Sequence, residues 1–446
     1  MTKINQKQKI ILTSILLLTT FICCLNQTMM LTSLPVISCD MHVGLNVSQW
    51  VNSGYFLIIG VVTPLTAGLY KRFSNRKLII SSLLILLIGT ILGCISKTFI
   101  FLLFSRVLQA TCHAILFSFL MTTMVSIYSL KKRGIVLGMT SMVISLGSAF
   151  GPTIGGLIIN YFNWHCLFYL TLPFVFLLLI ITIFIFPNYS SVENIHLDIK
   201  SMVLSLLGLG LFLSGITMLS TNIYFSLIII IVGIILIAYF IYIQDNMQKP
   251  LLQISILKQK NFRIFTIIGL LTFMLRTGYQ QMIPIFAENI LSLNTLISGL
   301  LILPGSIIYS LCAPLGGKIY DKHGNKIIIY GILIMILSNI CLLFVNHKTN
   351  VYYLCFIFCL MMFGYAGVYS PALSSAYKKI SMSQNSEGVA LNTTLRQTSG
   401  SIANTIMVIL FDWNNSLICG FKNSVIFTLI VLVLASISFY ASKYKK

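Results

Sequence analysis

Three arginines stand inside long apolar stretches of this sequence, where a charged side chain is costly. Arg106 is followed at i+3 and i+7 by Gln109 and His113, so the three side chains share one face of a helix. Placing an arginine in hydrocarbon costs roughly 2.5 to 3.5 kcal/mol, and a polar stripe offsets that cost when it faces the interior of a bundle. His113 has a reference pKa of about 6.5, which suits it to exchange a proton near neutral pH.

The other two arginines have polar neighbours of the same kind. Arg276 has Gln280 one turn further on, and Arg396 is followed by Gln397. Arg396 lies about one turn inside its apolar run, so its side chain could instead extend to the membrane surface. The remaining candidates for binding a substrate or a coupling ion are polar residues in, or at the end of, apolar runs: Asn26 and Gln27 near the end of the first run, Gln281 on the run of Arg276, and Glu288 at the outer end of that run.

The carboxylates of the chain argue against catalysis. All eight lie outside the middle of an apolar run: Asp40, Glu193, Asp198, Asp245, Glu288, Asp321, Glu387 and Asp412. An enzyme in the membrane would need a nucleophile, a metal cluster or paired carboxylates, and a nucleotide-driven pump would need a glycine-rich phosphate loop. The sequence shows none of these patterns. We therefore expect no metal, no cofactor and no enzymatic activity, with an ion gradient as the energy source.

The apolar runs must position these polar groups, and they fill the chain. Of the 446 residues, 57% are hydrophobic and 8% are charged, which is too little polar surface for a soluble globule of this size. A bilayer core about 30 Å thick needs about 20 helical residues to cross it. Fourteen runs of that length predict an all-α polytopic membrane protein: 10–32, 50–70, 78–96, 99–125, 135–159, 166–187, 200–219, 223–243, 263–287, 297–317, 326–346, 351–371, 392–411 and 423–442.

The positive charges of the chain alternate between its connections. A formal net charge of +21 on a soluble protein would suggest nucleic acid. Here 23 of the 29 lysines and arginines fall at the termini or in every second connection between apolar runs. This is the pattern of the positive-inside rule, so both termini are predicted to be cytoplasmic. The basic side chains then face anionic lipid, and nucleic acid is not expected as a partner.

The chain contains an internal repeat at an offset of 250 residues. Pro64 matches Pro314 and Asn75 matches Asn325, and each copy joins one apolar run to the next through a basic loop. Corresponding loops predict a duplicated six-helix unit, with the substrate between the two bundles. The predicted arrangement is 6+2+6, with an N-terminal six-helix bundle at 1–190, an inserted two-helix hairpin at 191–260 and a C-terminal six-helix bundle at 261–446.

A string of small residues in the fifth apolar run is the most specific motif. Residues 147–156 read GSAFGPTIGG, with Gly147, Gly151 and Gly155 one turn apart on one face. Glycines at this spacing let another helix approach backbone to backbone, and Pro152 bends the helix. The string resembles the antiporter motif of the major facilitator superfamily, and specifically of its fourteen-span drug:proton antiporters.

Other motifs carry the same resemblance over essentially the whole chain. Residues 67–77 are similar to the basic loop that follows the second span of the family, although Lys71 stands where the family has Asp and Ser74 where it has Gly. The second copy of the loop keeps both, as Asp321 and Gly324. Further matches lie at 25–35, where Asn26 replaces the Asp of the drug-exporter signature, and at 106–109, 299–305 and 395–400.

The resemblance implies a proton-coupled multidrug exporter that works by alternating access, as a monomer, in a bacterial plasma membrane. Its partners would be small amphipathic substrates, protons and the lipid bilayer. By analogy with the family, Asp321 would pair with an arginine or a helix end when the carrier faces outward. The residues expected to govern conformational change are Lys71, Arg72, Gly147, Gly151, Pro152, Gly155, Gly156, Asp321 and Gly324. A nutrient importer, or an exporter of one endogenous metabolite, siderophore, lipid or peptide, remains an alternative on the same fold.

The inventory of charges also bears on coupling and substrate. Asn26 cannot titrate, so the coupling proton is expected on His113 or Glu288. A dication stripped of water needs a fixed negative counter-charge, and the apolar runs hold three arginines and no central carboxylate. We therefore expect a neutral to positive site that favours zwitterions, neutral compounds and monocations over dications.

The topology can be tested by labelling single cysteines with a membrane-impermeant thiol reagent, in a variant whose native cysteines are replaced. Fourteen spans with cytoplasmic termini place Ser129 inside and Asn415 outside, because four predicted crossings separate Ser129 from the N-terminus and one separates Asn415 from the C-terminus. A cysteine at 415 should react in intact cells, and one at 129 only after the membrane is opened. Labelling at 129 from outside would contradict the topology.

Overall fold

In the computed structural model, all regular secondary structure among the described residues is helical. These residues are 5–48, 50–129, 132–188, 198–219, 223–247, 253–378, 380–381, 384–412 and 416–444. Asn415 and the predicted boundary at 190–191 lie outside these residues. The helices are α1 (Gln6–Met29), η1 (Met30–Ser33), α2 (Leu34–Asp40), α3 (Leu45–Ser48), α4 (Trp50–Val62), η2 (Thr63–Leu65), α5 (Thr66–Arg72), α6 (Asn75–Cys94), α7 (Phe99–Ile127), α8 (Arg133–Tyr161), α9 (Cys166–Ile185), α10 (Ile199–Thr217), α11 (Ile223–Asn246), η4 (Ile254–Lys258), α12 (Lys260–Asn289), α13 (Thr295–His323), α14 (Lys326–Leu342), α15 (Val351–Tyr377), α16 (Asn385–Asp412) and α17 (Leu417–Tyr444).

Every apolar run predicted from the sequence falls on a helix, which confirms an all-α polytopic protein. Among the described residues, ten helices are long and apolar enough to cross a membrane. Three more are apolar but shorter, at Trp50–Leu65, Lys200–Ile216 and Lys326–Leu342. The run at 50–70 is broken into α4, η2 and α5, because Pro64 opens a 3-10 turn there. The number of fourteen crossings stays a prediction.

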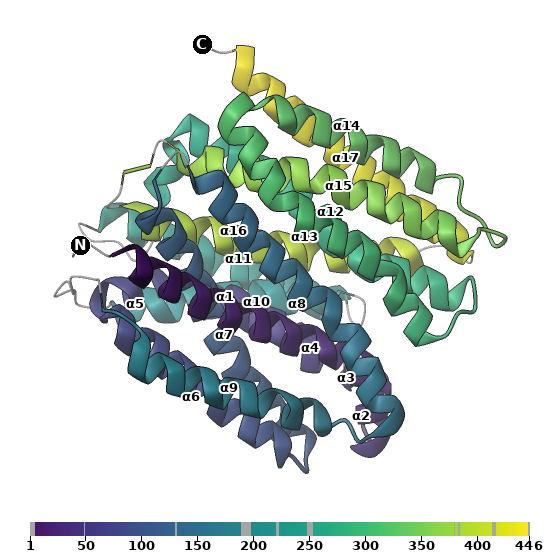
Figure 1. Cartoon of the computed structure of the whole chain (residues 1–446). Helices are drawn as coiled ribbons and strands as arrows, with labels where there is room; N and C mark the ends of the chain where they lie inside the picture. The colour runs from purple at the N-terminus through teal and green to yellow at the C-terminus, as the bar shows by residue number, and fades with distance from the viewer. Residues whose placement is uncertain are drawn as a thin grey trace.

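The helices pack as two groups that correspond to the two copies of the repeat. Helices α1, α4 and α6 to α9 contact one another, and α12 to α17 contact one another. In Figure 1, α6 and α9 lie at one edge of the bundle and α14 and α17 at the opposite edge, with α8, α13 and α16 between them. The contacts between the groups run from α8 to α13 and α15, and from α16 to α4, α5 and α7.

Helices α10 and α11 form a hairpin outside both groups. A Cβ at Gly233 would lie 2.6 Å from the backbone nitrogen of Phe212, so the two helices approach backbone to backbone. Helix α10 also contacts α4 of the first group and α16 of the second. The hairpin therefore covers one side of the junction between the groups.

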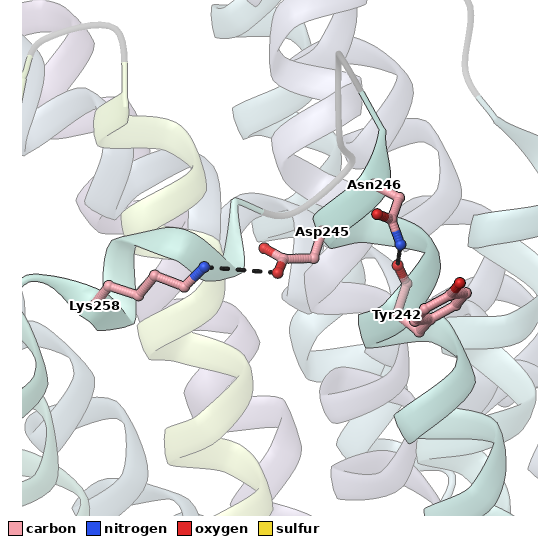
Figure 2. A network of polar contacts seen from close by, with 4 residues as sticks. All are labelled: Tyr242, Asp245, Asn246 and Lys258. Atoms are coloured by element: carbon pink, nitrogen blue, oxygen red, sulfur yellow. Dashed lines mark hydrogen bonds and ion pairs between the residues drawn. The ribbon is translucent and has the colours of Figure 1, made fainter.

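The end of the hairpin is joined to the second group through η4. Figure 2 shows Lys258 of η4 facing Asp245 at the end of α11, with 3.6 Å between Nζ and Oδ2. Beside this ion pair, Asn246 donates a hydrogen bond of 2.9 Å to the carbonyl of Tyr242. Both charged side chains are exposed, so the pair contributes at most about 1 kcal/mol and serves to orient the connection.

Helix α8 is held between α1 and α13 by its glycines. A Cβ at Gly147 would lie 2.8 Å from the carbonyl oxygen of Phe21, and one at Gly155 would lie 2.5 Å from that of Met29, both in α1. At the other end of α8, a Cβ at Gly138 would lie 2.5 Å from Cα of Pro314 in α13. The glycines of the string 147–156 therefore pack the C-terminal half of α8 on α1, whereas the N-terminal end of α8 packs on α13 of the second group.

The two copies of the basic loop have different residues at one pair of matching positions, Ser74 and Gly324, and the backbone conformations at these positions also differ. Gly324 ends α13 with φ of +68° and ψ of −147°, a conformation open almost only to glycine. The matching Ser74 has φ of −63°, which any residue adopts, and its hydroxyl accepts a hydrogen bond from the backbone of Lys77 at the start of α6. Serine in place of the family's glycine is therefore a helix cap.

Gly155 and Gly156 form a matched pair for testing the packing of α8. Gly155 has no room for a Cβ against Met29, whereas nothing lies within 4 Å of a Cβ at Gly156. Gly155→Ala should lower the thermal unfolding temperature of the purified protein by several degrees, because overpacking costs about 1 to 3 kcal/mol. Gly156→Ala should leave it equal or higher, because alanine favours helix. Equal melting of the two variants would refute this account of α8.

Candidate substrate and coupling site

Arg106 of α7 is buried and bound by groups from three helices. Its side chain is 1% exposed, and Nη1 donates to Oδ1 of Asn26 at 3.0 Å and to Oε1 of Gln109 at 2.8 Å. Its guanidinium carbon lies 4.3 Å from the ring centre of Tyr55 in α4. Gln109 in turn donates to Thr90 of α6 at 3.1 Å. The contact of Arg106 with the first apolar run is therefore made through a neutral amide, that of Asn26.

The two arginines of the second group are enclosed by aromatic rings instead. Arg276 of α12 is 8% exposed, and its guanidinium carbon lies 5.2 Å from the ring centre of Tyr309 and 5.8 Å from that of Tyr365. Arg396 of α16 is 5% exposed, so it does not extend to the surface. Its guanidinium carbon lies 4.4 Å from the ring centre of Phe117, 5.0 Å from that of Phe273 and 5.8 Å from that of Tyr369. Its Nη1 also donates a hydrogen bond to the hydroxyl of Tyr369.

These side chains form one continuous row, here called the arginine–aromatic row, that runs from the first helix group into the second. Each neighbouring pair in it is in ring or cation contact: Arg106 with Tyr55 (4.3 Å), Tyr55 with His113 (5.8 Å), His113 with Phe117 (6.2 Å), Phe117 with Arg396 (4.4 Å), Arg396 with Tyr369 (5.8 Å), Tyr369 with Tyr365 (5.3 Å) and Tyr365 with Arg276 (5.8 Å). The crossing point is Phe117 of α7 against Arg396 of α16. The row thus contains four of the predicted site residues: Arg106, His113, Arg276 and Arg396.

The rings alone do not offset the burial of these charges. A cation over an aromatic face gains about 0.5 to 2 kcal/mol, whereas burying an ion costs several kcal/mol even after relaxation. Arg106 adds two hydrogen bonds to side-chain amides, each worth about 1.5 to 3 kcal/mol when one partner is charged. Within the described part of the chain, none of the three arginines has a carboxylate partner. The second helix group therefore holds more uncompensated positive charge than the first.

His113 lies inside the row and bridges two helices of the first group. Its Nδ1 is 3.3 Å from the hydroxyl of Tyr55, and its Nε2 is 3.7 Å from Sγ of Cys24 in α1. The positive charges of Arg106 and Arg396 both repel a proton on the imidazole. A proton on His113 would therefore add a fourth positive charge to the row, between Arg106 and Arg396.

The other predicted site residues are more scattered. Gln27 is buried beside Asn26, and Gln280 and Gln397 are partly buried, whereas Gln281 is exposed. Glu288 accepts a hydrogen bond from Ser298 at the far end of α12, three turns beyond Arg276. The aromatic members of the row were not predicted. Phe117 continues the stripe of Arg106, Gln109 and His113 by one further turn, which is the one signal that the sequence offered.

Asp321 of α13 meets the beginning of α8, which belongs to the other helix group. Its carboxylate faces the backbone N–H groups of Gly134 and Ile135, which favour its charged form. These are among the free donors at a helix N-terminus, where the helix dipole also favours a negative charge. A Cβ at Gly134 would lie 2.7 Å from Oδ1 of Asp321, so glycine is needed for the contact. For Lys71, the matching residue of the first copy, only the backbone in α5 is described.

Comparison with known proteins identifies the family of this chain. The family model for the Major Facilitator Superfamily matches residues 16–404. The chain belongs to the major facilitator superfamily. It is therefore a multi-pass membrane transporter and not an enzyme, which confirms the expectation from its carboxylates.

Individual relatives cover most of the chain. It is 30% identical over 413 residues to the uncharacterized MFS-type transporter YcnB of Bacillus subtilis, covering 91% of this chain and 88% of that protein. It is 28% identical over 368 residues to the lincomycin resistance protein LmrB of Listeria innocua, covering 82% and 78%. The crystal structure of the human organic anion transporter MFSD10 superposes with a TM-score of 0.69, covering 96% and 99% at 14% identity. That last likeness shows the fold alone.

The contact of Asp321 can be tested by removing its charge. Asp321→Asn keeps the shape of the side chain but weakens its attraction to the end of α8, so transport should fall about fivefold or more while the amount in the membrane is unchanged. Asp245→Asn, which alters an exposed carboxylate in the hairpin, serves as the matched control. Uptake into inverted vesicles measures both. Normal transport by Asp321→Asn would contradict a role for this contact in the cycle.

Proposed function

We propose that this transporter exports amphipathic drugs and dyes, using the proton gradient as its energy source. The carrying observation is the arginine–aromatic row, which crosses between the two helix groups where a substrate of an alternating-access carrier binds. The similarity to a lincomycin resistance protein over 82% of the chain supports a drug as the substrate.

The proposed architecture follows the resemblance and the charge pattern. Fourteen helices cross the bacterial plasma membrane as 6+2+6, with both termini in the cytoplasm, and the transporter acts as a monomer. The fourteen predicted runs each fall on a helix of the structure, and the contacts of α10 with both groups suit an inserted hairpin.

The proposed substrates are planar amphipathic molecules without two positive charges. Flat aromatic side chains recur along the row, and stacking on them is favourable for planar ligands. No carboxylate is part of the row among the described residues, so a dication finds no counter-charge there. Zwitterions and neutral compounds are expected to move faster than dications.

His113 is the proposed carrier of the coupling proton. It contacts Tyr55 within the row and Cys24 of α1 beside it, whereas Glu288 lies at the far end of α12. Because charging His113 alters the electrostatics of the row, proton binding and substrate binding are linked there, as coupled transport requires. Asp40, the acid that follows the first run, accepts a hydrogen bond of 2.8 Å from Trp164 and has a structural role.

The test is efflux by purified protein in liposomes with an imposed proton gradient. The wild type should move planar amphipathic compounds faster when the gradient is present, and His113→Gln should remove that dependence while substrate still binds. Glu288→Gln and the exposed His347→Gln should both keep it. A matched monocation and dication should be separated in favour of the monocation.

Three results would count against the proposal. If both His113→Gln and Glu288→Gln keep gradient-driven efflux, neither residue carries the proton. Faster transport of the dication would contradict the proposed charge of the site. Transport of one metabolite and no drug would favour the alternative of a dedicated exporter.

A further inference from the structure

We propose that the substrate carries a carboxylate or an equivalent planar anionic group, and that Arg276 and Arg396 bind it together. The inference rests on the proposed transport function, because it names the chemical class of substrate that the same site takes. It narrows the proposed zwitterions, neutral compounds and monocations to substrates that carry a negative group.

The first observation is a contrast between the two helix groups. Nη1 of Arg106 has acceptors in Asn26 and Gln109, and its Nε donates to the carbonyl of Val51 at 3.4 Å. The protein therefore supplies oxygen atoms in the plane of that guanidinium. The first arginine has little need of a ligand, although its Nη2 has no partner.

The arginines of the second group lack such acceptors. Arg396 donates from Nη1 to Tyr369, but its Nε is buried without a hydrogen-bond partner. Arg276 is more than nine-tenths buried, and its described contacts are the faces of Tyr309 and Tyr365. An arginine has five N–H donors in one plane, and aromatic faces cover that plane from above without accepting from its edge.

A third hydrogen-bond donor without a partner belongs to the same part of the row, between Arg276 and Arg396. The hydroxyl of Tyr365 is buried and has no partner, and its ring lies between the two arginines, 5.3 Å from the ring of Tyr369. A phenol hydroxyl donates readily to an anionic oxygen. Two guanidinium groups and one hydroxyl with spare donors are together the chemistry that holds a carboxylate, since guanidinium pairs with it through two parallel hydrogen bonds.

The rings around the arginines define the rest of the ligand. Tyr365 and Tyr369 are stacked at an interplanar angle of 22°, and Phe117 and Phe273 face Arg396. A planar aromatic acid would place its carboxylate at the guanidinium edges and its rings against these faces. In a zwitterion, the ammonium end could extend toward His113, where a proton on the imidazole would repel it and so exchange substrate for proton.

The experiment compares binding of two pairs of probes to the protein in lipid nanodiscs. The fluoroquinolone norfloxacin is compared with its methyl ester, which keeps the rings and the amine but loses the carboxylate, and 2-naphthoate is compared with 2-naphthamide. The carboxylate of at least one pair should bind about tenfold more tightly than its partner. Arg276→Gln and Arg396→Gln should each remove that preference, and Tyr365→Phe should reduce it. Arg263→Gln alters an exposed arginine of α12, the helix that carries Arg276, and should leave the preference for the carboxylate unchanged.

A second measurement guards against variants that fail to fold. In the wild type, the preference should vanish as the pH falls through the carboxylate's own titration, because the neutral acid has no charge to pair. Equal binding within both probe pairs, or a preference that survives both arginine replacements, would overturn the inference. Carboxylate-selective binding without transport of any compound would uphold the inference and reject the exporter function. Drug transport at equal rates with and without the carboxylate would reject the inference and uphold the exporter function.

Discussion

The structure depends on the burial of three guanidinium groups that have no matching carboxylate among the described residues. Each charge must be surrounded by groups that replace water, because an unpaired ion in an apolar interior costs several kcal/mol. In the first helix group, Asn26, Gln109 and the backbone of Val51 meet this demand for Arg106. In the second, aromatic faces meet it only in part, and the difference leaves binding capacity at the contact between the groups.

The helices can present these side chains only if they approach one another closely and still move. The glycines of α8 provide the close approach, since they remove side-chain bulk against α1 at one end and against α13 at the other. Antiparallel contact between α8 and α13 joins the two groups, and Asp321 binds the N-terminus of α8 at the end assigned to the cytoplasm. A contact made by one carboxylate and backbone donors can be broken and remade without unfolding either helix. That is suited to alternating access.

Much of the fold could be predicted from the sequence because hydrophobic length is a one-dimensional signal. The ends of the apolar runs lie within seven residues of the helix ends: α7 spans Phe99–Ile127 against the predicted 99–125, and α16 spans Asn385–Asp412 against the predicted 392–411. Periodicity also grouped Arg106 with His113. What the sequence could not give was the pairing across the two groups: nothing in the chain near Arg396 indicates that Phe117, almost three hundred residues earlier, lies against it. Likewise, the exposure of Gln281 beside the partly buried Gln280 depends on how α12 is rotated in the bundle.

The substitution of Asn26 for the family's acid takes its meaning from the same balance of charge. With an acid there, Arg106 would be neutralised within the protein, whereas asparagine accepts a hydrogen bond and leaves the positive charge in place. The most direct measurement is a structure of the protein in a lipid nanodisc with bound norfloxacin. The account predicts the ligand on the arginine–aromatic row, with its carboxylate within hydrogen-bond distance of Arg276 or Arg396. A ligand bound away from the row, or one that turns its amine toward these arginines, would contradict it.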